Sequence, residues 1–158
     1  MKLLIVLGEG GHTIEMLNLV DLLGDRYEYH YVLTKEDNLS ADHIRRPGPT
    51  YRLTRPRGKD TKTLPSILRT ICTILQALPV LLRVRPDAIV TVGPAVGVPV
   101  SILGKLLGAR IIFIETGSHI TFSSMTGRIL YRWADLYFVQ WPQLEEKLSR
   151  AIYAGRLI

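Results

Sequence analysis

Cysteine is almost absent from this sequence, which has a single one, Cys72, among 158 residues. One cysteine excludes a disulfide within the chain and any metal site built from several cysteines. It is also typical of a protein from a reducing compartment. Because Cys72 falls in an apolar pattern with helical spacing, we expect its thiol to pack in the core. We expect no metal site and no tightly bound cofactor.

Long apolar runs are also missing. No uncharged apolar run reaches the roughly 18–20 residues of a membrane-spanning helix, and the first one, residues 2–7, is too short for a secretory signal. The sequence contains neither repeats nor low-complexity segments. With 47% apolar residues it is long enough for one domain with its own core, which we expect to span residues 1–158.

Acidic residues are scarce between residues 45 and 69, where only Asp60 opposes eight basic side chains. The basic residues of this stripe are Arg45, Arg46, Arg52, Arg55, Arg57, Lys59, Lys62 and Arg69. Such a local excess indicates either an anionic partner or a solvated loop. The stripe has only one aromatic residue, Tyr51, so it offers little for base stacking and we expect no nucleic-acid partner.

Strand-length apolar runs alternate with helical patterns along the whole chain. The predicted strands cover residues 3–7, 28–34, 50–55, 88–92, 110–115 and 136–140. The predicted helices cover residues 12–23, 63–84, 96–107 and 122–133, with a short one at 40–46. This alternation predicts an α/β fold with a Rossmann-like, doubly wound parallel sheet. Ligands of such sheets bind at the carboxyl ends of the strands, which here are followed by the loops 8–12, 93–96 and 115–121.

The first of these loops reads GEGGHT, and its glycines permit a tight turn before a helix start, where free amides favour an anion. The pattern is neither GxGxxG nor GxxxxGK[ST], so a structural turn and an anion-binding turn both remain open. His12 would lie at the helix start. There the helix dipole disfavours a cation, which favours a neutral imidazole that can accept a proton. The alternative is a histidine that only holds the loop through hydrogen bonds. Glu9 either points away from a bound phosphate or takes part in catalysis.

The third loop reads IETGSH and clusters Glu115, Thr116 and His119. A carboxylate at the end of a buried strand is costly unless it binds something, so we expect a site role for Glu115. Residues 63–84 form the longest helical pattern, with large apolar residues on one face. Two hypotheses remain open for it: packing on the sheet, or docking on a membrane surface beside the basic stripe.

Several stretches together resemble one family. They are GEGGHTIEM, VGPAVGVPV, IFIET, SSMTGRILYRWADLYFVQWPQL and the closing YAG, in order between residues 3 and 156. The sequence is identified as a member of the acceptor-binding, membrane-anchoring subunit family of bipartite UDP-N-acetylglucosamine transferases. The resemblance implies half of a GT-B glycosyltransferase, with the sugar-nucleotide half on a separate chain. It also implies peripheral attachment to the cytoplasmic face of a membrane and a polyprenyl-diphosphate-linked sugar as acceptor.

The resemblance also assigns roles to individual residues for an inverting transfer from a UDP-sugar. His12 is the expected general base, with Glu115 as the second choice. The residues expected to bind the acceptor or its diphosphate are Gly10, Gly11, Thr13 through its amide, Arg55, Arg57, Thr116 and His119. The carboxyl end, with Tyr153, Leu157 and Ile158, is expected to dock the partner chain. A non-catalytic membrane scaffold that only recruits the partner is the alternative.

Three departures from the family pattern stand out. Eukaryotic members begin with a membrane-spanning segment, whereas here the first predicted strand starts almost at once. Ala95 stands where the family often has a second glycine, and His119 stands where it often has an arginine. If that arginine contacts diphosphate, His119 makes the contact weaker or dependent on pH.

Overall fold

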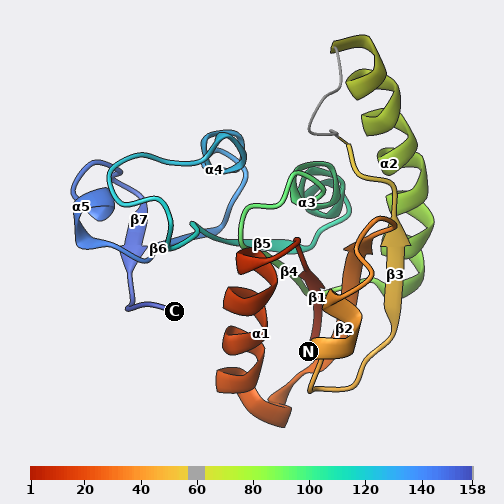
Figure 1. Ribbon diagram of the computed structural model, residues 1–158, viewed down its shortest axis with the longest axis horizontal. Helices are drawn as coiled ribbons and strands as arrows, with labels where there is room; N and C mark the ends of the chain where they lie inside the picture. Colours follow the sequence, from red (N-terminus) through yellow and green to blue (C-terminus); the bar gives the residue numbers. More distant parts are fainter. Residues whose placement is uncertain (57–62, 158) are drawn as a thin grey trace.

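The computed structural model describes residues 1–56 and 63–157 (Figure 1). Within that part, seven parallel strands form one sheet in the order β3-β2-β1-β4-β5-β6-β7. The strands are β1 (Lys2–Val6), β2 (Glu28–Thr34), β3 (Thr50–Leu53), β4 (Ala88–Thr91), β5 (Arg110–Ile114), β6 (Leu136–Val139) and β7 (Ala151–Tyr153). The doubly wound, Rossmann-like fold is therefore confirmed.

Helices cover both faces of the sheet. They are α1 (Gly11–Leu23), α2 (Thr63–Val84), α3 (Gly97–Leu106), α4 (Met125–Leu130) and α5 (Pro142–Glu145), with 3-10 turns η1 (Gly24–Arg26) and η2 (Ser40–His43). Alternate β1 residues enter two cores, because successive side chains of a strand point to opposite faces. Ile5 lies in the core that α1 covers, and Leu4 lies in the core under α2, α3 and α4.

Most predicted boundaries agree with the structure to within two residues, but two predicted helices need correction and one strand was missed. The helix expected at 122–133 is only the six residues of α4, which starts after Ser124, whose hydroxyl caps it. The short helix expected at 40–46 is the 3-10 turn η2. The edge strand β7 was not predicted, because three residues are too few to show a period of two.

Cys72 is exposed, so the prediction of a packed core thiol is wrong. The cause is the orientation of α2, which faces the domain at Thr73, Ala77, Leu81 and Val84 rather than at Cys72. Thr73 is fully buried and donates a hydrogen bond to the carbonyl of Thr54 at 2.7 Å, and Ala77 is 1% exposed. Large apolar side chains of the same helix are turned outward, namely Ile67, Leu68, Ile71, Leu75, Leu78 and Leu82.

The segment Ser66–Val84 of α2 meets the length and composition of a membrane-crossing helix, with a mean hydropathy of 1.6 and 22% of its window buried. Arg69 and Arg83 lie within this segment, so the expectation that no uncharged apolar run reaches spanning length still holds. Within the domain, α2 is held by hydrogen bonds to the segment after β3, where the Gln76 side chain accepts from the Thr54 amide at 2.8 Å.

Candidate functional site

The loops after β1 and β4 meet around His12. A β-carbon placed on Gly8 would come within 2.9 Å of the β-carbons of His12 and Pro94, so both loops pack against the histidine. Gly93 has a φ of 89°, a conformation that favours glycine, and its missing side chain leaves room beside the imidazole. Two glycine turns from different strands therefore frame one histidine at the carboxyl edge of the sheet.

The His12 ring is partly exposed, yet its Nδ1 atom is buried and has no hydrogen-bond partner among the described residues. Burial lowers the pKa of His12 below its ordinary value of 6.5, because the charged form loses its solvation. The carboxylates of Glu15 and Glu115 oppose this shift, and His119 adds to it. The imidazole is therefore neutral near pH 7, which is the form that accepts a proton.

The glycine loop exposes its glycines but uses the polar groups of Thr13 within the turn. Gly10 caps α1 with a φ of 64°, and both Gly10 and Gly11 are exposed. The Thr13 amide, which was expected to hold a diphosphate, instead donates to the Gly10 carbonyl at 3.1 Å. The Thr13 hydroxyl donates to the Gly8 carbonyl and lies 2.7 Å from the Ser40 hydroxyl. Thr13 therefore stabilises the turn, and its role in binding a diphosphate stays a prediction.

Arg55 lies beside the glycine loop, as a diphosphate-binding residue would. Its Nη1 atom donates to both carboxylate oxygens of Glu9, at 3.0 and 3.1 Å. This pair ties the segment after β3 to the loop and points Glu9 toward a cation. An incoming diphosphate would have to compete with Glu9 for the guanidinium. Arg57 lies outside the described residues.

Glu115 is fully buried, and its contacts are internal. Its Oε2 atom accepts from the Ser124 amide at 3.0 Å and from the Tyr137 hydroxyl at 3.1 Å. The carboxylate thus anchors the start of α4, and it raises the pKa of Tyr137 together with burial, which is the larger cause. It is not exposed to a substrate in this structure, where it anchors α4, and its expected site role stays a prediction.

The tight packing around Glu115 yields a stability prediction. A β-carbon on Gly127 would collide with the Glu115 carboxylate and come within 2.6 Å of the Tyr137 hydroxyl. Gly127→Ala should therefore lower the free energy of unfolding by about 2 kcal/mol or more in denaturant titrations. Gly11→Ala is the matched control, because nothing lies within 4 Å of a β-carbon there. Equal midpoints for the two variants would contradict this packing.

Thr116 and His119 complete the predicted set. The Thr116 hydroxyl points inward and donates to Oε1 of Glu15 at 2.8 Å, so its side chain is not free to bind a ligand. His119 is partly exposed, packs edge-on against Phe122 with ring centroids 4.9 Å apart, and has a buried Nδ1 atom without a partner in the described chain. In this loop, the Nδ1 atom of His119 is therefore available to form a hydrogen bond with a ligand.

Three residues of the site were not predicted: Glu15, Gln140 and Trp141. Glu15 is 4% exposed and accepts from Thr116, from the Gly117 amide at 3.2 Å and from the Gln140 side chain at 3.0 Å. Trp141 donates from Nε1 to the Gly117 carbonyl at 2.7 Å. Glu15 could have been noticed in the sequence, because it is an acidic residue within the apolar helical pattern of residues 12–23.

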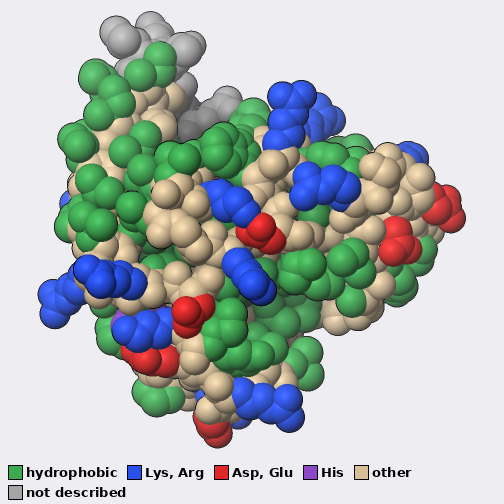
Figure 2. All heavy atoms as spheres, turned by 180° about the vertical axis from the view of Figure 1, so that it is seen from behind, with side chains coloured by type: hydrophobic (Ala, Val, Ile, Leu, Met, Phe, Trp, Pro, Cys, Tyr) green, Lys and Arg blue, Asp and Glu red, His purple; other side chains and the backbone are tan. Residues whose placement is uncertain are grey.

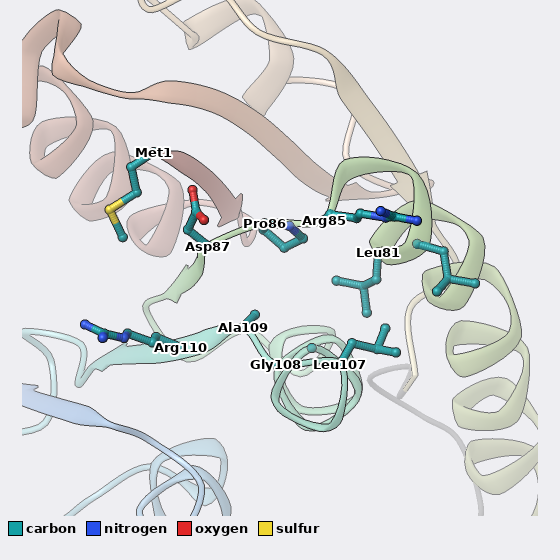
Figure 3. Close-up of a pocket in the computed structure, with 11 residues that line it drawn as sticks. Met1, Leu81, Arg85, Pro86, Asp87, Leu107, Gly108, Ala109 and Arg110 are labelled. Atoms are coloured by element: carbon teal, nitrogen blue, oxygen red, sulfur yellow. The ribbon is translucent and has the colours of Figure 1, made fainter.

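The described surface has hollows at both ends of the strands. One of about 470 Å³ adjoins the glycine loop, between α1 and η2, and Gly10, Thr13 and Arg45 help to line it. Another of about 820 Å³ lies at the amino ends, between the last turns of α2 and α3 and the start of β5 (Figure 3). None of the predicted site residues lines the second hollow.

Comparison with known proteins shows the family to which the chain belongs. Residues 3–157 match the family model described as "Oligosaccharide biosynthesis protein Alg14 like". The chain belongs to the Alg14-like family. It is 33% identical to the mouse "UDP-N-acetylglucosamine transferase subunit ALG14", covering 100% of this chain and 83% of that one. The human protein of the same name is 31% identical with the same coverage, and the baker's yeast protein is 30% identical over 77% of its length.

Solved structures agree with the fold. MurG of Acinetobacter baumannii superposes with a TM-score of 0.77 over 97% of this chain at 19% identity. UDP-GlcNAc 2-epimerase of Methanocaldococcus jannaschii superposes with a TM-score of 0.76 over 99% at 18% identity. The chain spans less than half of those structures, 45% and 46%. The fold is thus that of the amino-terminal half of GT-B proteins, as predicted.

Proposed function

We propose that this chain is the membrane-associated, acceptor-binding subunit of a two-component inverting glycosyltransferase. It binds a polyprenyl-diphosphate-linked sugar and recruits a sugar-nucleotide-binding chain, for the synthesis of a lipid-linked oligosaccharide or polysaccharide. The donor is a UDP-sugar, held mainly by the partner. The observation that carries the proposal is the neutral His12, framed by two glycine turns, in a member of the Alg14-like family.

His12 acts as the general base in this proposal. An acceptor hydroxyl attacks the anomeric carbon of the UDP-sugar, the bond to the diphosphate breaks with its electron pair, and the imidazole takes the hydroxyl proton. Gly10, Gly11 and Arg55 lie on the loop side, where exposed amides and a guanidinium suit a diphosphate. Glu115 positions α4 rather than accepting the proton, and His119 faces the acceptor.

Attachment to the cytoplasmic face of a membrane occurs through α2. Its exposed apolar side chains form a continuous face, which Figure 2 shows as the hydrophobic side chains gathered along this helix. Arg69 and Arg83 on the same helix are exposed, as interfacial helices require. An exposed apolar face of this size on a described surface indicates an interaction site rather than a solvated one.

Charged substitutions on α2 test this attachment. Ile71→Glu combined with Leu75→Glu should lower binding to anionic vesicles at least tenfold in sedimentation assays, because two large side chains leave the apolar phase. Both side chains are about half exposed or more, so the fold should survive. Leu39→Glu is the matched control, since Leu39 is 73% exposed but lies away from α2. Equal vesicle binding by the double variant and the control would exclude docking through α2.

Acceptor binding separates the proposal from the scaffold alternative. The chain alone, in vesicles, should bind polyprenyl-diphosphate-linked N-acetylglucosamine in preference to polyprenyl monophosphate, measured by retention of radiolabelled lipid. Arg55→Ala should weaken this binding, because Arg55 lies beside the glycine loop, and Arg110→Ala, at the opposite end of the sheet, should not. A chain that recruits the partner yet shows no preference for the acceptor would be the scaffold.

A further inference from the structure

The carboxyl-terminal tail, residues 154–157, returns from β7 toward α1 (Figure 1). The backbone of Leu157 is held on both sides. Its amide donates to the side-chain oxygen of Gln140 at 2.7 Å, and its carbonyl accepts from the side chain of Asn18 at 2.7 Å. The Arg156 guanidinium lies over the Trp141 ring, 3.6 Å from its centroid. The tail is therefore seated on specific side chains.

Two chains of hydrogen bonds connect those side chains to the 115–119 loop. In the first, Gln140 donates to Glu15, which accepts from the amide of Gly117. In the second, Trp141 donates to the carbonyl of Gly117. Both polar groups of the Gly117 backbone are thus held: the carbonyl by Trp141, which lies under Arg156 of the tail, and the amide by Glu15, which reaches the tail only through Gln140.

Glu15 is a costly residue for this position. Its carboxylate is 4% exposed and receives its hydrogen bonds from neutral donors, and the described residues give it no ion pair. Burial of a charge without a counter-charge destabilises the fold. Glu15 also lies one turn of α1 from His12, and its charge raises the pKa of that histidine. The fold retains a buried charge that touches the tail's anchor, the 115–119 loop and the base.

We propose that Glu15, Gln140 and Trp141 are positioning residues that couple seating of the tail to the conformation of the 115–119 loop and the placement of His12. Because partner docking at the tail belongs to the proposed function, the inference rests on that function. Binding of the partner then holds the tail in place, and the loop is ordered for the acceptor. Transfer is consequently restricted to the assembled pair.

Amide hydrogen exchange of the chain alone tests the coupling. Removing residues 156–158 should speed exchange in the 115–119 loop at least fivefold, about the factor for one lost neutral hydrogen bond, and leave β2 unchanged. Trp141→Phe keeps a ring under Arg156 but removes the N–H donor, so it should speed exchange in the same loop. Lys147→Met is the matched control, because Lys147 donates to the Thr121 carbonyl at 3.0 Å and is not linked to the tail.

A readout in the assembled transferase separates positioning from mere stability. Trp141→Phe should raise KM for the acceptor and leave KM for the donor and affinity for the partner unchanged. Glu15→Gln should move the acid limb of the pH profile to lower pH, because the charge that raises the pKa of His12 is lost while Glu115 and His119 are kept.

The outcomes distinguish the inference from the function on which it rests. If the truncated chain shows unchanged exchange at residues 115–119, the coupling is wrong, whether or not the partner binds. If exchange rises but the partner binds elsewhere, the coupling holds and the docking site proposed for the partner fails. Faster exchange with Lys147→Met as well would reduce the effect to general loosening and overturn the inference.

Discussion

His12→Gln is expected to lower kcat of the assembled transferase by about 10²–10⁴-fold, the range for loss of a general base. Glutamine fills similar space and cannot accept the proton. The Nδ1 atom of His12 makes no hydrogen bond in the described chain, so the substitution breaks none there, and partner binding should stay unchanged. The measurement is a transfer assay with a UDP-sugar and a polyprenyl-diphosphate acceptor.

The pH profile sharpens this prediction. Burial lowers the pKa of His12 below 6.5, so the neutral base persists as pH falls to 6.5 and is lost as pH falls through the lower pKa. The acid limb of wild-type kcat/KM, which reports the pKa values of the free enzyme, should therefore lie below pH 6.5. In His12→Gln this limb should be missing from the residual activity. A variant with full activity and an unchanged limb would show that the base belongs to the partner or to another residue.

Removal of residues 153–158 is expected to abolish association with the sugar-nucleotide-binding chain. Tyr153 is 36% exposed on the edge strand β7, and its neighbour Ile152 is 40% exposed, so apolar surface lies open beside the tail. Ile158 lies outside the described residues. Central apolar and aromatic interface residues typically contribute about 2 kcal/mol or more, a factor of roughly 30 in affinity. Co-purification and calorimetry of the two chains measure the effect.

A point variant protects this test from a folding artefact. The truncation also removes the hydrogen bonds of Leu157 to Gln140 and Asn18. Tyr153→Asp leaves both bonds in place and should still weaken association strongly. Arg132→Ala, an exposed change at the end of α4, serves as the control. Association retained in both the truncated chain and Tyr153→Asp would move the partner to another surface.

The helix α2 illustrates what periodicity predicts and what it leaves open. Its boundaries, 63–84, were predicted correctly, because the apolar spacing runs through six turns. The face that packs on the sheet was not determined by that spacing. Thr73, Ala77 and Leu81 face the domain, whereas six other large apolar residues between Ile67 and Leu82 face outward. The apolar spacing in the sequence is the same whether that face of the helix packs on the sheet or lies against a surface outside the domain.

The site shows a similar division. The role of His12 as general base came from the family resemblance and stays a prediction, but its place after a strand and before a helix could be predicted from the local sequence. Glu15 could not, since its partners Thr116 and Gln140 are 101 and 125 residues away along the chain. The groups expected to bind ligands at Thr13 and Thr116 make hydrogen bonds within the chain: the Thr13 amide locally to the Gly10 carbonyl, and the Thr116 hydroxyl to Glu15, 101 residues away.

Transfer by separately purified chains tests the central claim most directly. This chain and its sugar-nucleotide-binding partner should be mixed with UDP-N-acetylglucosamine and a polyprenyl-diphosphate-linked acceptor in vesicles, and the extended lipid measured. We expect the extended lipid only when both chains are present, and at least a hundredfold less of it when this chain carries His12→Gln. Full transfer by the partner alone, or by the pair with His12→Gln, would contradict it.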